Sequence, residues 1–168
     1  MNPGQLTLDI DIVVPAGALG NTTAAYMSKK MGLPLGKICV GTNVNDVTHR
    51  AIQTGKFHRS DEMKQTLSEA ITIQVPYNFE RVLYFLTDGD DALLRRWMTE
   101  MDATSQLDIE KRWLDKLQDE FASARITDDE MCFATQRAKD KLNYIIDPHT
   151  AVAFAAADKL GIVTTVCI

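Results

Sequence analysis

One stretch constrains the fold of this chain more than any other, because an alternating apolar run ends there in a glycine-spaced turn and a new amphipathic segment starts at once. Apolar residues alternate with polar ones from Leu6 to Val14, which is typical of a β-strand. The turn that follows contains Gly17 and Gly20, and Asn21 is placed to cap a helix that ends near Met31. The order predicted is therefore strand, glycine turn, helix.

A turn of this kind can close its backbone N–H groups around an anion. Glycine imposes no Cβ and tolerates positive φ, and the start of a helix adds unpaired N–H donors and the positive end of the helix dipole. The expected ligand is a phosphate group. Two glycines in a strand-to-helix turn are a weak signal by themselves, so the rest of the chain must decide.

The alternation of strands and helices continues along the chain. The unit from Leu8 to Thr42, closed by a short apolar strand over 37–42, has the length of a β-α-β crossover, so a parallel sheet is expected. A helix capped by Asn45 or Asp46 follows, and residues 70–75 are predicted to form another strand that Pro76 ends. The fold class indicated is α/β.

The later part of the chain is predicted to be mostly helical before the alternation resumes. Residues from about 88 to 143 carry apolar stripes at helical spacing and are expected to form a helical insertion, with Thr127 and Glu130 as a capping box. Asp147 is then expected to cap an alanine-rich helix that ends at Gly161, followed by a strand over 162–168. Residues 1–168 are accordingly expected to form a single α/β domain.

Composition excludes several classes of protein. The 168 residues include 18 basic and 23 acidic side chains without a basic cluster, which argues against a nucleic-acid surface. The longest apolar run, Ala151–Ala157, has seven residues, and the first residues lack the apolar core of a signal peptide, so a soluble, cytoplasmic protein is expected. The three cysteines are far apart and favour reduced thiols over disulfides or zinc.

Other candidate sites carry weaker signals than the glycine turn. His49, His58 and His149 stand outside any metal-ligand spacing, so no metal site is predicted, although His149 lies beside a helix cap where it could point toward a ligand. The acidic run 88–91 lacks the spacing of a calcium loop and is expected to be a solvated turn. No G-x-S-x-G or cysteine–histidine pattern supports a covalent hydrolase.

Four stretches in order closely resemble the threonine synthases and, more specifically, the threonine synthase-like 2 group of proteins that use pyridoxal 5′-phosphate (PLP). These stretches are Val14–Asn21 with the following Ala25–Pro34, Thr42–Val47 with His49 and Arg50, Ile73–Arg81, and Asp147–Ala153. The resemblance runs from about Ile12 to the end of the chain.

The resemblance implies a PLP-dependent enzyme of fold-type II, the tryptophan synthase β-like fold. Residue by residue, it implies that the cofactor phosphate is held by Gly17, Ala18, Leu19, Gly20 and Asn21, and that Thr150 faces the pyridine nitrogen. The threonine synthase-like 2 group implies a phospho-lyase that converts O-phosphohomoserine or O-phosphothreonine into 2-oxobutanoate. Biosynthetic threonine formation is the alternative within the family.

Two departures from the family pattern limit what the resemblance implies. Ala16, Ala18 and Leu19 stand where threonine synthases usually have a hydroxyl residue and then Asn-Phe, so backbone donors remain and side-chain donors do not. None of the lysines lies in the phenylalanine-rich setting of the family's Schiff-base lysine, so no catalytic residue is assigned. The chain is expected to be the C-terminal part of a catalytic domain that needs an N-terminal lobe or self-association. The other possibility is a catalytically inactive short form that acts as a binding or signalling protein.

Overall fold

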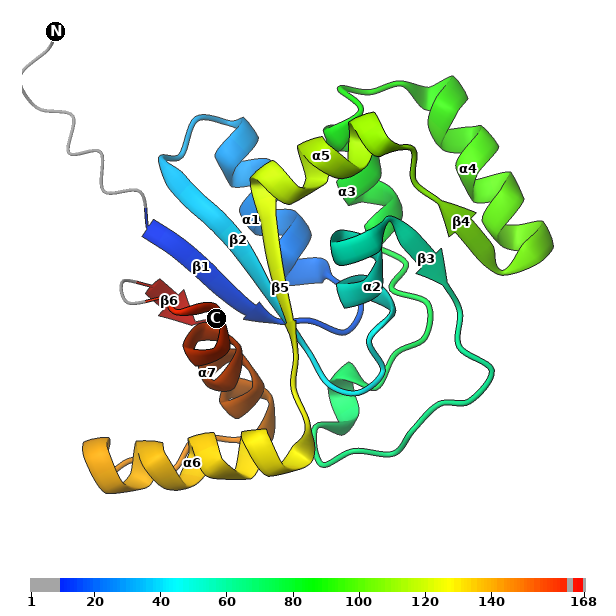
Figure 1. The fold of residues 1–168 in the computed structure, drawn as a ribbon. Helices are drawn as coiled ribbons and strands as arrows, with labels where there is room; N and C mark the ends of the chain where they lie inside the picture. The colour runs from blue at the N-terminus through cyan, green and yellow to red at the C-terminus, as the bar shows by residue number, and fades with distance from the viewer. Residues whose placement is uncertain (1–9, 163–164, 168) are drawn as a thin grey trace, which may run out of the picture.

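A parallel β-sheet with helices on both faces forms the centre of the protein (Figure 1). The structure, a computed structural model, describes residues 10–162 and 165–167. The sheet has the strand order β5-β2-β1-β6. Its strands are β1 (Ile10–Pro15), β2 (Leu35–Thr42), β5 (Phe121–Arg125) and β6 (Thr165–Cys167), and all neighbouring pairs are parallel. The predicted α/β class and parallel sheet are confirmed.

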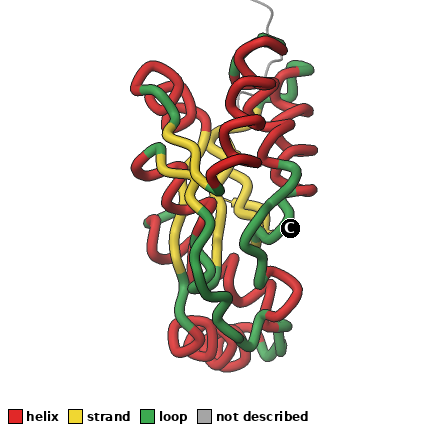
Figure 2. The backbone as a smooth tube through the Cα atoms, turned by 90° about the vertical axis from the view of Figure 1, so that its right-hand side faces the viewer, coloured by secondary structure: helices red, strands yellow, loops and turns green. Residues whose placement is uncertain are grey.

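The two faces of the sheet are covered by different helices, and Figure 2 shows the strands between them. Because side chains alternate along a strand, Val14 and Val40 bury into one core while Val13 and Cys39 bury into the other. The first core also contains residues from α1 (Gly20–Lys30), α2 (Val47–Thr54), α3 (Phe79–Leu86), α4 (Asp91–Thr104) and α5 (Lys111–Glu120). The second core is formed with α6 (Asp128–Leu142) and α7 (Pro148–Leu160).

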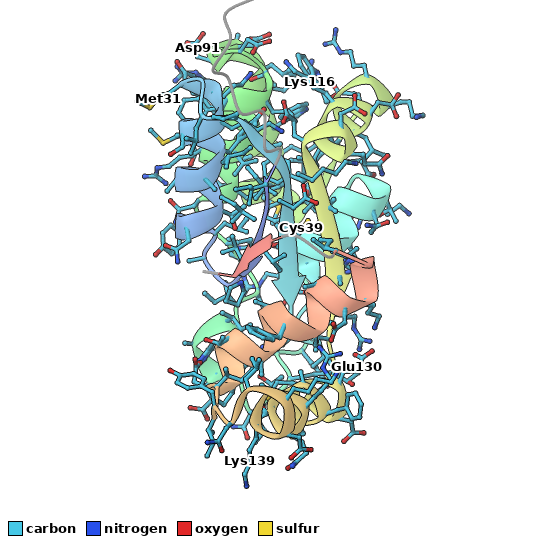
Figure 3. All side chains as sticks on the ribbon, turned by 90° about the vertical axis from the view of Figure 1, so that its left-hand side faces the viewer. Met31, Cys39, Asp91, Lys116, Glu130 and Lys139 are labelled. Atoms are coloured by element: carbon cyan, nitrogen blue, oxygen red, sulfur yellow. The ribbon has the colours of Figure 1, made fainter. Side chains whose placement is uncertain are left out.

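The alanine-rich helix α7 lies close against β2, next to Cys39 (Figure 3). A Cβ at Gly41 of β2 would lie 3.1 Å from Ala156 Cβ and 3.2 Å from the Val152 carbonyl oxygen. Small side chains on the helix and none on the strand therefore allow the close approach. The predicted N-cap Asp147 and the C-terminal Gly161 are both confirmed.

The segment expected as a helical insertion over about 88–143 contains α4, α5 and α6 and also two strands. β4 (Gln106–Asp108) pairs antiparallel with β3 (Lys56–His58), and β5 is an edge strand of the central sheet. Phe121 continues the apolar stripe of α5, so helical spacing extends into a strand that has only five residues and contains two alanines. The Thr127–Glu130 capping box at the start of α6 is confirmed.

The strand predicted for residues 70–75 is absent as well. Residues Glu69–Ile71 form one turn of 3-10 helix, η1, and 72–76 are irregular, because the side chains around them bond this segment to the end of β2 rather than to a neighbouring strand. The start of the first predicted strand, residues 6–9, and residues 163, 164 and 168 of the last one lie outside the described part.

Two of the cysteines lie in different surroundings. Cys39 is buried and Cys132 exposed, and both are free thiols. Burial is the main cause that raises the pKa of Cys39 to about 11. Across residues 10–162 and 165–167, no helix has the length and apolar character needed to cross a membrane.

Candidate functional site

The glycine turn lies at the carboxyl end of β1, and the Ala16 N–H donates to the Gly41 carbonyl oxygen of β2 at 2.8 Å. α1 begins at Gly20, two residues before the start that an N-cap at Asn21 predicts. Leu19 occupies the N-cap with φ 64°, a left-handed conformation, and its side chain is buried. The prediction of Asn21 as N-cap is therefore wrong, because the sharp bend at Leu19 starts the helix earlier. Asn21 is exposed on the first turn.

The turn presents backbone donors without protein acceptors. Over the described part of the chain, the N–H groups of residues 17–22 donate to no protein acceptor. The first turn of α1 also contains no acidic residue, so no side-chain carboxylate offsets the positive end of the helix dipole. Unpaired N–H groups at such a position fit an anion of the size and charge of a phosphate.

Gly17 is in close contact with the η1 turn. A Cβ at Gly17 would lie 2.8 Å from Ile71 Cα and 3.1 Å from the Ala70 carbonyl oxygen, closer than side chains normally approach. At Gly20 the nearest atom, Asn78 Nδ2, would be 3.9 Å away. Gly17 is required so that η1 can cross the turn, whereas Gly20 leaves room beside the helix start.

The start of α7 forms the second part of the candidate site. Asp147 accepts hydrogen bonds from the His149 N–H at 2.9 Å and the Thr150 N–H at 3.3 Å, and the Thr150 hydroxyl donates to its other oxygen. The Thr150 hydroxyl is the largest cause that lowers the pKa of Asp147 to about 2. Since α7 leads back to β6, which is parallel to β1, its N-terminus lies at the carboxyl edge of the sheet, as the glycine turn does (Figure 1).

The η1 turn connects these two parts. Its Ala70 N–H donates to His149 Nε2 at 3.1 Å, while His149 Nδ1 lies 3.1 Å from Asp147 Oδ1. Because Nε2 accepts, the neutral ring carries its proton on Nδ1 and donates to Asp147. η1 thus contacts Gly17 on one side and His149 on the other. The structure thereby brings predicted site residues from the two ends of the chain into one neighbourhood.

Sequence reasoning missed a buried polar cluster that holds η1 to the end of β2. The side-chain amide of Asn43 donates to Thr66 Oγ1 at 3.0 Å and to Thr72 Oγ1 at 3.1 Å, and its oxygen accepts the Asn45 N–H at 2.9 Å. Ser68 lies in the same cluster. Asn43 belongs to a stretch that resembles the family. The sequence, however, gives no signal that several hydroxyl residues of a loop accept hydrogen bonds from this one asparagine.

Two of the histidines and the acidic turn, which the sequence offered as weaker candidates, bond to neighbouring side chains of the protein. His49 bonds Ser123 at 2.9 Å, and burial is the main cause that lowers its pKa. His58 bonds Asp108 across β3 and β4, and Asp88 pairs with Lys30 and Lys116. No three histidine, cysteine or acidic side chains gather into a metal-binding group among the residues that the structure describes.

Comparisons with known proteins agree on one family. The chain is 38% identical to human threonine synthase-like 2 over 144 residues. The aligned region covers 86% of the chain and 30% of that protein. It is 32% identical over 170 residues to the threonine synthase of Saccharomyces cerevisiae, which covers 94% of the chain and 33% of the yeast protein. The chain belongs to the threonine synthase family. It spans about a third of the length of these curated relatives.

Solved structures show the same relationship. A PLP-bound threonine synthase from Brucella melitensis matches with a TM-score of 0.91 and 29% identity over 98% of the chain and 35% of that structure. The yeast threonine synthase matches with a TM-score of 0.86 and 33% identity over 94% of the chain and 33% of that structure. A maize serine racemase at 13% identity and a TM-score of 0.58 shares the fold alone.

These matches confirm fold-type II, present here as part of the domain of a threonine synthase family member. No family model matches the chain.

Proposed function

We propose that this chain supplies the cofactor-binding side of a PLP-dependent lyase. The observation that carries the proposal is the set of N–H groups of residues 17–22. They have no acceptor among the residues that the structure describes, and they lie at the start of a helix whose first turn contains no acidic residue. In the proposed complex, Gly17, Ala18, Leu19, Gly20 and Asn21 bind the cofactor phosphate, and Thr150 faces the ring nitrogen. PLP-bound threonine synthase from Brucella melitensis supports this choice of cofactor.

The residues of this chain would orient the cofactor and neutralise its charge. PLP itself acts as an electron sink for bond breaking next to an amino-acid nitrogen. The helix start holds the phosphate through backbone donors, which stay in place because Leu19 is buried and Gly17 lies under η1. The Asn43 cluster fixes η1, and the cap at Asp147 fixes Thr150. Each residue in this scheme binds or positions, and none forms a covalent bond.

The substrate class we propose is a phosphorylated amino acid, O-phosphohomoserine or O-phosphothreonine, which would lose phosphate to give 2-oxobutanoate. The identity to human threonine synthase-like 2 favours this reaction for the whole protein. Threonine synthase activity is the second candidate, because the yeast threonine synthase matches nearly the whole chain at 32% identity. Product analysis separates the two candidates, since one yields 2-oxobutanoate and the other threonine.

The anion site can be tested by adding one carboxylate. Gly20→Asp places a negative charge at the helix start, where it stabilises the helix and competes with phosphate. We expect PLP and inorganic phosphate to shift the backbone amide NMR signals of residues 17–22 in the natural chain, and binding to weaken at least about tenfold in Gly20→Asp, which is about 1.4 kcal/mol. Ala24→Asp, an exposed position farther along α1, adds the same charge as a matched control.

Three outcomes would contradict parts of the proposal. The anion site is wrong if phosphate shifts signals elsewhere and leaves residues 17–22 unchanged, or if both aspartate variants weaken binding equally. The assignment of no covalent residue is wrong if PLP forms an absorbance band that survives dialysis. Lys64 is the first lysine to replace in that case, because it lies with Arg125 around a polar pocket of about 440 Å³ beyond the ends of β2 and β5. Lys29, by contrast, pairs with Glu120 at 2.7 Å.

A further inference from the structure

Ala70 of η1 contacts both the imidazole of His149 and the glycine turn. Its N–H donates to His149 Nε2 at 3.1 Å, and its carbonyl oxygen lies 3.1 Å from the position that a Cβ would take at Gly17. Ile71 Cα is nearer still, at 2.8 Å from that position. The bond that attaches η1 to α7 is therefore next to the contact between η1 and the turn.

The hydrogen bond from Ala70 to His149 exists only while the imidazole is neutral. A neutral imidazole has one nitrogen that donates and one that accepts, whereas both nitrogens of the protonated ring carry hydrogen. Nδ1 lies 3.1 Å from Asp147 Oδ1, so Nε2 is the accepting nitrogen. When Nε2 takes a proton from water, its new N–H faces the Ala70 N–H, and the bond that holds this side of η1 is lost.

We propose that His149 is a positioning residue for the glycine turn: its neutral ring holds η1 against Gly17, and protonation of the ring weakens anion binding at residues 17–22. The inference rests on the proposed function, because it takes from it that these residues bind a phosphate group. His149 acts through η1 and not through contact with the anion.

η1 keeps a second attachment when His149 is protonated. Thr72, directly after η1, accepts a hydrogen bond from the Asn43 amide at 3.1 Å, and this bond involves no titratable group. Protonation therefore loosens η1 on the side of α7 and leaves it attached to the end of β2. We expect anion affinity to fall about threefold, the size of one exposed hydrogen bond, while the fold is kept.

The neighbouring charged groups keep their charge while His149 titrates. Charged side chains come to the start of α7 from α7 itself, from η1 and from the two ends of α6: Asp147, Glu69, Asp128, Lys139, Asp140 and Lys141. Ordinary carboxylates are charged above about pH 5 and ammonium groups below about pH 9, so the imidazole is the group that changes across about pH 5–8.

Two perturbed groups near α7 also stay constant in this range. The Thr150 hydroxyl, as the largest cause, lowers the pKa of Asp147 to about 2, so this carboxylate remains charged. The strands beneath α7 add apolar side chains and the Cys39 thiol, and burial is the main cause that raises the pKa of Cys39 to about 11. The thiol therefore remains neutral.

The test uses sulfate, a tetrahedral dianion that resembles phosphate but does not titrate near neutral pH as phosphate groups do. Its affinity for the full 168-residue chain is measured at several pH values from the amide NMR signals of residues 17–22. We expect the dissociation constant to rise about threefold as the His149 ring becomes protonated, and the Ala70 amide signal to move with the same midpoint.

The reverse measurement has a sign that separates this inference from simple charge attraction. Because linkage is reciprocal, adding sulfate at a pH where both ring forms are present should lower the protonated fraction of His149. An anion that only attracted a nearby imidazolium would raise that fraction instead. An increase in the protonated fraction overturns the inference.

Three variants test the same coupling. In His149→Gln the side-chain oxygen can replace Nε2 and accept the Ala70 N–H at every pH, so sulfate affinity should stay at the natural high-pH value. His149→Leu removes the acceptor and should bind weakly at every pH. His58→Gln is the matched control, because His58 bonds Asp108 in the separate β3–β4 sheet, and it should keep the natural pH dependence.

The outcomes distinguish this inference from the proposed function. If sulfate binds at residues 17–22 with the same affinity across the pH range, the inference is overturned alone. If His149→Gln keeps the pH dependence of the natural chain, another group causes it and the inference is also wrong. If sulfate leaves the signals of residues 17–22 unchanged at every pH, both the proposed function and the inference are overturned.

Discussion

Gly17 and Gly20 lie three residues apart, yet a side chain would have different consequences at each. At Gly17 the added carbon meets the main chain of η1, which cannot move without displacing its bond to His149. At Gly20 there is space. The two glycines of the turn therefore have different roles: Gly17 is required for packing against η1, and Gly20 leaves space at the start of the helix.

Replacing each glycine by alanine tests this difference. Gly17→Ala should lower the free energy of unfolding by about 1–3 kcal/mol, because overpacking against backbone atoms forces η1 away. Gly20→Ala should change it by less than about 0.5 kcal/mol. Urea unfolding gives both values, and the amide NMR signal of Ala70 reports the η1 displacement. Equal stability of the two variants would show that η1 does not lie against Gly17 in solution.

At the level of residues, the sequence predicts helix caps well, because a cap depends on residues that are close together in the chain. The Asp147 cap with Pro148 and the Thr127–Glu130 box each depend on residues a few positions apart, and both are present. The Asn43 cluster could not be predicted, because its partners Thr66 and Thr72 are more than twenty residues away and leave no periodic pattern. The left-handed Leu19 was missed because a buried leucine gives no sign of positive φ.

Among the elements, those that carry amphipathic periodicity and clear ends were predicted best. Its cap, its alanines and Gly161 predict α7, whereas the sequence predicts helix across β5 because Phe121 continues the apolar stripe of α5. The pairing of β5 with β2 depends on the hydrogen bonds that β2 leaves open on that side. This pairing between distant segments determines the structure of residues 121–125, although their spacing weakly favours helix.

The start of α7 should give the protein a pH dependence in acid. The pKa of Asp147 lies at about 2 in the folded chain against an ordinary value of 3.8, so its charged form stabilises the fold. This contribution is complete above about pH 4 and is lost as the pH falls toward 2. The natural chain should therefore lose stability relative to Asp147→Asn between those values.

Urea unfolding of the two chains across this pH range gives the comparison, and added salt should reduce the effect because the carboxylate is partly exposed. Thr150→Val removes the largest cause of the shift and should narrow the difference. A difference that stays constant with pH would contradict the assigned hydrogen bonds.

At the scale of the whole molecule, large apolar side chains remain exposed on α6 and just after its end. Leu142, Tyr144 and Ile145 are 61%, 65% and 71% exposed, and Phe133 on α6 is 69% exposed. Phe133 also lines a groove of about 520 Å³ between α6 and α7. Exposed apolar side chains at the end of a helix are candidates for contact with another protein surface.

We therefore expect the chain by itself to associate as its concentration rises. Sedimentation analysis should show reversible association in the natural chain and less of it in a Tyr144→Ser, Ile145→Ser variant, because the apolar contact area is smaller. Met31→Ser is the control, since Met31 is 84% exposed at the end of α1, away from α6 (Figure 3). A natural chain that stays monomeric at high concentration would refute the expected partner surface.

The order of strands in the sheet has a consequence for synthesis of the chain. β1, α1 and β2 are consecutive and can form through local contacts, whereas β5 reaches β2 only after α2–α5 have been made, and β6 comes last. Until then the backbone N–H and C=O groups on both edges of the described β1–β2 pair have no strand partner. The edge of β2 that later pairs with β5 contains Ile38, Cys39 and Val40. A nascent chain that stalls before Arg125 therefore exposes an unpaired apolar strand edge. Such an edge can bind a chaperone or pair with a second nascent chain.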